Sequence, residues 1–181
     1  MCTANEAGFG SAAEALRVGA AFADYLNSPA VADLEPAALG EALVSLGEIQ
    51  SRLTIAHADF LCRFDAHDAH EADGFGSSAA WLAAKAKLAK KDAKAAVRQM
   101  RMLGRHPMLA RGMAAGEISD SWAREIVGWL KKLPEELREG TEKILADAAA
   151  GGASLEDLAV ITASRVVMRY RPASDIWAVS H

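Results

Sequence analysis

The sequence predicts an all-α fold: one long helix followed by a series of short helix–turn–helix units in one bundle. Alanine, the best helix former, occupies 40 of the 181 positions. Residues that favour strands are sparse by comparison. Apolar residues recur every three or four positions over long stretches, which is the spacing of one helix face. These three observations indicate closely spaced helices with a thin core.

The first predicted helix covers residues 11–26. Ser11 is a suitable N-cap, because a serine hydroxyl can accept a hydrogen bond from a free amide of the first turn. Pro29 prevents the helix from continuing. We therefore assign residues 1–35 to an N-terminal helix and its linker. This segment does not resemble a signal peptide. No run of about 20 apolar residues is present, so no membrane partner is expected.

A long helix is predicted over residues 36–72, with Pro36 in its first turn. Six apolar side chains follow three-and-four spacing along it, with Gln50 and His57 at the two polar steps. The six are Leu39, Leu43, Leu46, Leu53, Phe60 and Phe64. Two interpretations of this apolar stripe stay open. It can be buried within one chain, or it can form the seam of a homodimer, as in a coiled coil.

Six short helices are predicted after the DGFG turn at 73–76. They cover residues 78–87, 90–104, 107–115, 120–132, 135–150 and 155–170. Pro107 and Pro134 suit first turns, and the expected N-caps are Ser78, Ser119 and Ser154. We assign residues 36–170 to one helical domain and residues 171–181 to an irregular C-terminal end.

A loose internal repeat runs through the short helices. Leu88, Ile118 and Ala153 occupy comparable places in three segments, at spacings of 30 and 35 residues. Each segment combines a turn of small residues with the start of a short helix. Such periods are typical of helical repeats, although any alanine-rich series of helices can produce a match of this kind.

Charge is distributed unevenly along the chain, whose net charge is −4. Residues 1–84 carry a net charge of −9, residues 85–111 a net charge of +8, and residues 112–181 a net charge of −3. In a straight helix, six of the basic side chains fall on one face, roughly 140° from the apolar face. These six are Lys87, Lys91, Lys94, Arg98, Arg101 and Arg105.

Three interpretations of this basic stretch stay open: a solvated surface, contact with double-stranded DNA, and contact with an acidic partner such as the protein's own N-terminal half. The DNA interpretation rests on the helix-turn-helix rhythm of residues 81–97, because the second helix of that motif enters the major groove. The sequence departs from this motif at its turn, where Lys87 occupies the position usually given to glycine. Only Gln99 is available to read adenine edges, so phosphate contact is favoured over base readout. The candidate nucleic-acid-binding residues are Lys87, Lys90, Lys91, Lys94, Arg98, Arg101 and Arg105.

No other motif justifies assigning a catalytic residue, metal ligand or cofactor. His67 and His70, within FDAHDAHEAD, could share a helix face as metal ligands, but a polar helix end is the favoured interpretation. Phosphate loops, dinucleotide fingerprints and nucleophile motifs are absent. Four glutamates are interpreted as a solvated helix face: Glu135, Glu136, Glu139 and Glu142. The four tryptophans are interpreted as core or interface anchors: Trp81, Trp122, Trp129 and Trp177.

The cysteine content favours a cytoplasmic protein. Cys2 and Cys62 are the only cysteines, and two cysteines do not make a disulfide framework. A reducing compartment is therefore the simplest expectation. Free cysteine is among the residues most often buried, so Cys62 is expected in the core.

Several motifs occur in an order that resembles a known family. Arg52 and Leu53 in the long helix are followed by DGFGSSAAWLA at 73–83 and MLGRHPMLARGMAAGEISDSWAREIV at 102–127. Over residues 40–165 this order resembles the N-terminal helical domain of the 13E12 repeat family, also called domain-of-unknown-function family 222. The resemblance implies an association with a downstream HNH endonuclease domain. The HNH motif does not occur in these 181 residues, so the resemblance implies a role in positioning on DNA or in assembly.

Overall fold

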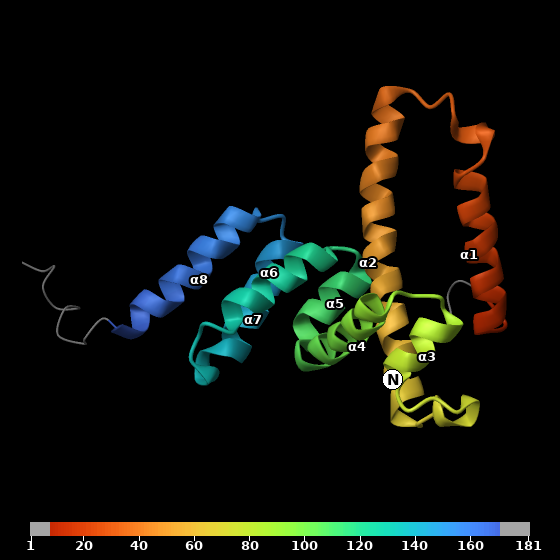
Figure 1. The fold of residues 1–181 in the computed structure, drawn as a ribbon. Helices are drawn as coiled ribbons and strands as arrows, with labels where there is room; N and C mark the ends of the chain where they lie inside the picture. The colour runs from red at the N-terminus through yellow and green to blue at the C-terminus, as the bar shows by residue number, and fades with distance from the viewer. Residues whose placement is uncertain (1–7, 171–181) are drawn as a thin grey trace, which may run out of the picture. The chain divides into compact units, whose positions relative to one another are not determined.

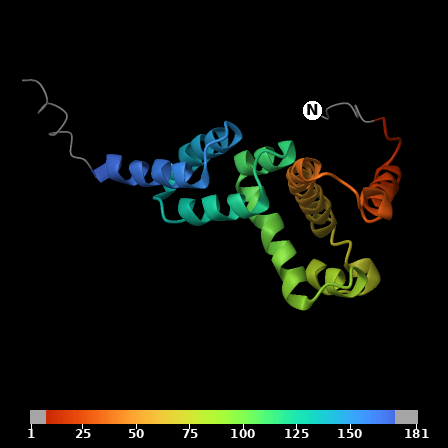
Figure 2. The same cartoon turned by 90° about the horizontal axis from the view of Figure 1, so that it is seen from above.

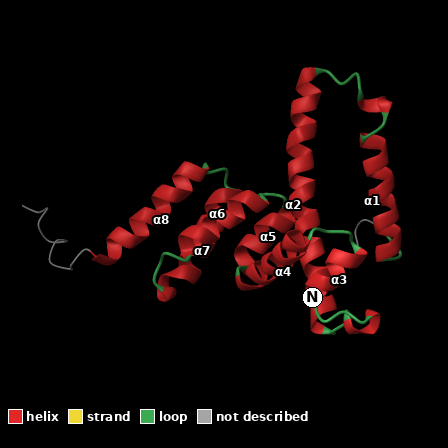
Figure 3. Ribbon diagram, in the orientation of Figure 1, coloured by secondary structure: helices red, strands yellow, loops and turns green. Residues whose placement is uncertain are grey.

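All secondary structure in the part of the chain that the structure describes is helical (Figure 3). The computed structural model describes the backbone of residues 8–170 and the side chains of residues 8–165. The α-helices are α1 (Ala12–Leu26), α2 (Pro36–Ala66), α3 (Ser78–Lys85), α4 (Lys90–Arg105), α5 (Pro107–Ala115), α6 (Asp120–Leu130), α7 (Glu135–Ala150) and α8 (Leu155–Tyr170). The predicted all-α class is therefore confirmed. The segment expected to be irregular, residues 171–181, and with it Trp177, lies outside the described residues.

The chain divides into two compact units, Met1–Val44 and Ser45–His181. The first contains α1, a short 3₁₀ helix at Pro29–Val31, and the start of α2. Ser11 caps α1 as expected, because its Oγ accepts a hydrogen bond from the Glu14 amide at 3.1 Å. No residue of α1 is buried. Four large apolar side chains of α1 are exposed: Leu16, Val18, Phe22 and Tyr25.

The long helix is shorter at its C-terminus than predicted, since α2 ends at Ala66 and not at residue 72. Asp68 adopts a left-handed backbone conformation, with φ of 48°. The Asp68 amide bonds to the Asp65 carbonyl, and the Ala69 amide bonds to the Phe64 carbonyl. This pair of hydrogen bonds is the Schellman motif, which satisfies the last carbonyls of a helix and turns the chain away. A second 3₁₀ helix at Glu71–Asp73 follows.

Only part of the predicted apolar stripe of α2 packs in the second unit, where Phe64 lies against the core. The buried residues of α2 are Ser51, Ala58 and Leu61. Leu53 and Phe60, both on the stripe, keep 61% and 54% of their surface exposed. The expectation that Cys62 is buried was wrong, because its position on α2 leaves it exposed.

The hydrophobic core of the second unit lies mostly among the shorter helices. These helices follow one another from α3 to α8 (Figures 1 and 2). Helix α3 packs on α4, α5 on α7, and both α6 and α7 on α8. The large apolar side chains that are fully buried here are Leu109, Met113, Ile118, Ile126, Leu130, Leu133, Leu145 and Leu158. Trp81, Trp122 and Trp129 are half-buried and pack against this core, in agreement with the anchor interpretation.

The three positions of the internal repeat all lie in turns that connect successive helices. Leu88 lies between α3 and α4, Ile118 between α5 and α6, and Ala153 between α7 and α8. A residue with positive φ comes shortly before each, and φ is 55° at Lys87, 83° at Gly116 and 88° at Gly152. The repeat in the sequence therefore corresponds to a repeated turn geometry that points an apolar side chain into the core.

Arg52 holds the end of α5 within the second unit. Its Nη2 donates a hydrogen bond to the Ala115 carbonyl at 2.7 Å. A cation at this place also interacts favourably with the negative end of the helix dipole. A side chain at Gly116 would collide with this contact, since its Cβ would lie 2.9 Å from Arg52 Nε. Arg52, the first residue of the Arg52-Leu53 step in the family resemblance, therefore has a structural role in joining α2 to α5.

Candidate nucleic-acid interface

Helix α4 separates apolar and basic side chains onto different faces. Its buried residues are Ala93, Val97, Met100 and Leu103. Its six basic candidates are all exposed: Lys90, Lys91, Lys94, Arg98, Arg101 and Arg105. We call these six side chains the basic stripe. At 1.5 Å per residue the stripe is about 22 Å long. The apolar face anchors α4 to the core, so the stripe is held on a fixed helix surface.

Lys87 lies outside this helix. The sequence analysis placed it in line with Lys91 and Lys94, but α3 ends at Lys85 and α4 begins at Lys90. Lys87 is exposed in the connecting turn, with φ of 55°. The left-handed conformation explains why glycine suits this position, because a Cβ atom is unfavourable there. Lys87 is therefore a neighbour of the stripe and not a member of it.

No acidic side chain among the described residues forms an ion pair with the basic stripe. At the start of α4, Ala89 provides no side-chain cap for the free amides. Lys90 and Lys91 add positive charge to the positive end of the helix dipole, and Asp92 in the same turn offsets part of this repulsion.

The preceding helix α3 is fixed by an exposed network around Asp73. Trp81 Nε1 donates to Asp73 Oδ2 at 2.7 Å, and Lys85 Nζ lies 3.3 Å from the same oxygen. The indole hydrogen bond, followed by the Lys85 interactions, lowers the pKa of Asp73 from its ordinary value. The Trp81 ring packs on Phe64, with 4.6 Å between centroids. Trp81 thus links α2 to α3, and its hydrogen-bonding group is already occupied.

Gln99, the one amide side chain in the basic stretch, is directed inward. Its Nε2 donates a hydrogen bond to Asp120 Oδ1, which joins α4 to the start of α6. An amide held in this way cannot also make the paired hydrogen bonds that read an adenine edge. The exposed surface of α4 therefore presents mostly cations and small side chains, with Asp92 as its one acidic residue, and this chemistry suits phosphates.

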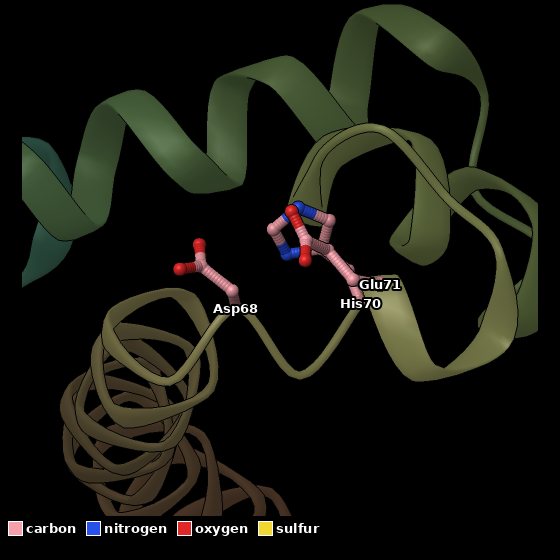
Figure 4. Close-up of side chains that lie close together, drawn as sticks. All are labelled: Asp68, His70 and Glu71. Atoms are coloured by element: carbon pink, nitrogen blue, oxygen red, sulfur yellow. The ribbon is translucent and has the colours of Figure 1, made fainter.

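The two possible metal ligands of the FDAHDAHEAD segment lie in a turn and not, as the sequence had suggested, on a helix. His67 and His70 lie beyond the last residue of α2 and do not share a helix face. His67 is exposed, whereas His70 is buried beside Asp68 and Glu71 (Figure 4).

Two of the three predicted serine caps are confirmed, and the third is wrong by one residue. Ser78, predicted as the cap of α3, is the first residue of that helix, and the capping hydroxyl belongs to Ser77. Ser119 and Ser154 cap their helices as predicted.

One buried carboxylate was missed by the sequence analysis. Glu142 was assigned to a solvated face with its neighbours on α7, but it is 5% exposed. Glu142 Oε2 lies 2.8 Å from His106 Nδ1, and Oε1 accepts a hydrogen bond from the Met108 amide at 3.0 Å. A signal was available, because Pro107 at the start of α5 leaves Met108 as the next amide that needs an acceptor.

Comparison with known proteins identifies the family of the chain. Residues 41–172 match the family model described as a domain of unknown function, DUF222. Neither the curated proteins nor the solved structures contain a match. Among the described residues, no helix is both long enough and apolar enough to cross a membrane. The matched segment includes α3, α4 and the helices that support them, so the chain belongs to the DUF222 family.

Proposed function

We propose that this protein is a noncatalytic DNA-binding or targeting module of an HNH-endonuclease-like protein, and that α4 contacts the DNA. The observation that carries the proposal is the basic stripe: six exposed cations on one face of a helix whose opposite side is anchored in the core. Lysine and arginine at regular spacing neutralise phosphates and release bound counterions, which drives association. The catalytic histidines of an HNH domain would lie outside these residues.

Two further features support contact with the DNA backbone over sequence readout. The side-chain amide of Gln99 already donates a hydrogen bond to Asp120 and is not available to a base. The α3–α4 pair also places Lys90 and Lys91 at the N-terminal end of its second helix, the end that approaches DNA in helix-turn-helix proteins. Lysine acts as a point charge and contacts phosphate without requiring a particular base. We therefore expect affinity for duplex DNA with little sequence preference.

The test is a titration of labelled duplex DNA, followed by fluorescence anisotropy, over a range of salt concentrations. Engagement of five or six phosphates gives a slope of roughly −5 for the logarithm of affinity against the logarithm of salt concentration. Replacing Lys94 and Arg98 together with glutamate should weaken binding at low salt by at least about tenfold and reduce the slope by about two.

The matched control is the pair Lys131→Glu and Lys132→Glu, which makes the same change in net charge at two exposed residues outside α4. This control should bind DNA with an affinity close to that of the unaltered protein. Circular dichroism should show all variants to be equally helical. Equal losses in the two double variants would mean that only net charge matters, and the proposed role of α4 would be rejected.

A second candidate function, self-association through α2, is favoured by the exposed apolar stripe. Leu53 and Phe60 face solvent on this helix, as do Leu39 and Leu43 nearer its start. Exposed apolar side chains that recur at helical spacing are typical of a helix that pairs with another. In this function the stripe on α2 forms a homodimer, and the basic stripe serves as a solvated surface.

Light scattering with a concentration series tests this second candidate. We expect a dimer, and we expect Leu53→Glu with Phe60→Glu to convert it to a monomer, because two charges in an apolar seam are costly to bury. Asp59→Lys, an exposed change on the same helix, is the control and should leave the dimer intact. A monomer at all concentrations, without any substitution, would reject the homodimer.

A further inference from the structure

Three potential metal ligands come together in the turn that follows α2. A carboxylate oxygen of Asp68, a carboxylate oxygen of Glu71 and a ring nitrogen of His70 all lie within 4.8 Å of one another (Figure 4). Asp68 and Glu71 are exposed, so a cation could reach them from solvent. His70 is 7% exposed, and its ring lies 6.4 Å from that of Phe64, which helps to fix its orientation.

Ser78 and Asp65, which lie next to the buried side of His70, determine which ring nitrogen of His70 can bind a cation. The Ser78 hydroxyl donates to Asp65 Oδ1 at 2.6 Å, so its hydrogen is already used. Ser78 Oγ lies 3.5 Å from His70 Nδ1 and can only accept from it. Of the two neutral tautomers, this arrangement favours the one with its proton on Nδ1, in which the lone pair lies on Nε2. A metal-binding histidine commonly has its second nitrogen held in this way by an outer hydrogen-bonded group.

The spacing of the ligands suits a small divalent cation after modest side-chain rotation. Zinc bonds to nitrogen and oxygen at about 2.0–2.2 Å, which places tetrahedral ligands about 3.4 Å apart. The present separations, up to 4.8 Å, can close to that value through the Asp68 and Glu71 side chains. One imidazole with two carboxylates is a donor set for zinc and its first-row neighbours, and is less suited to magnesium, which prefers oxygen alone.

We infer that Asp68, His70 and Glu71 form a binding site for a divalent first-row cation of the zinc class, with water completing the coordination. Asp65 and Ser78 are positioning residues, which act through His70. The site connects the end of α2 to the start of α3, because Ser78 is the first residue of α3. Cation binding would stabilise this connection. The inference is independent of DNA binding and of self-association.

Isothermal titration with Zn²⁺ alone tests the site, after dialysis against a chelator. Both cysteines are replaced by serine in every sample, so that thiolates do not contribute. We expect one Zn²⁺ per chain and a melting temperature that rises by several degrees with zinc. Asp68→Asn with Glu71→Gln should weaken binding by at least tenfold. Both side chains are exposed, and asparagine accepts the left-handed backbone of position 68, so this variant should fold.

His67→Gln is the matched control, since His67 is an exposed histidine in the same turn. It should bind zinc as the parent chain does. Ser78→Ala should weaken binding about 10- to 100-fold, which is typical when an outer hydrogen bond to a ligand is lost. Nitrogen-15 NMR of the histidine rings should place zinc on His70 Nε2. Absence of a 1:1 complex, unchanged binding in the Asp68/Glu71 variant, or a loss in His67→Gln would overturn the inference.

Discussion

Replacing Glu142 with alanine should lower the free energy of unfolding by about 3 kcal/mol. Glu142 is buried on α7, and its two oxygens contact His106 Nδ1 and the Met108 amide at the start of α5. Alanine removes both acceptors at once. The imidazole, with 17% of its side chain exposed, and an amide of the first helical turn then lose their partner. Such groups are costly when they are left unsatisfied away from water.

Urea denaturation of matched variants measures this effect. Glu142→Gln keeps the size of the side chain and an oxygen that can accept from Met108, so its loss should be smaller than that of alanine. Glu139→Ala is the control, because Glu139 is exposed on the same helix and its replacement should change stability by no more than about 0.5 kcal/mol. If Glu142→Ala were as mild as Glu139→Ala, the buried contacts would contribute little to the fold.

Replacing Gly112 with alanine should destabilise the protein by about 2 kcal/mol, although alanine normally favours a helix. Gly112 is buried in α5, and a Cβ there would lie 2.5 Å from Ile118 Cδ1 and 2.8 Å from Ile118 Cγ1. Ile118 is fully buried in the turn after α5. The isoleucine must therefore shift against its neighbours in a packed core, which costs more than the helix propensity gains.

A double-mutant cycle separates the collision from any general effect of alanine. Ile118→Ala removes both colliding atoms, so Gly112→Ala in that background should be neutral or stabilising. Gly140→Ala is the control for propensity. Gly140 lies in α7 with open space around its Cα, and alanine there should stabilise by up to about 1 kcal/mol. Equal effects of Gly112→Ala in the two backgrounds would show that Ile118 is not the cause.

The helices and several of their boundaries could be predicted from the sequence because the forces that define them are local. Ser11, Ser119 and Ser154 cap helices through hydrogen bonds that span three residues. The separation of basic and apolar faces on α4 follows from the spacing of its residues alone. The exposure of the basic stripe was predictable for the same reason. The end of α2 was missed because Asp68 supplies a left-handed turn for which glycine is the usual signal.

The sequence by itself determined the helical class, the turns and the place where positive charge accumulates. Only the tertiary structure decided which face of α2 is buried, since Ser51 and Ala58 pack inward while Leu53 and Phe60 do not. It also decided that Glu142 is buried, because its partners His106 and Met108 lie at the start of α5, 36 and 34 residues away in the sequence. Local spacing specifies which residues share a face, but burial depends on the neighbours that distant segments bring to it.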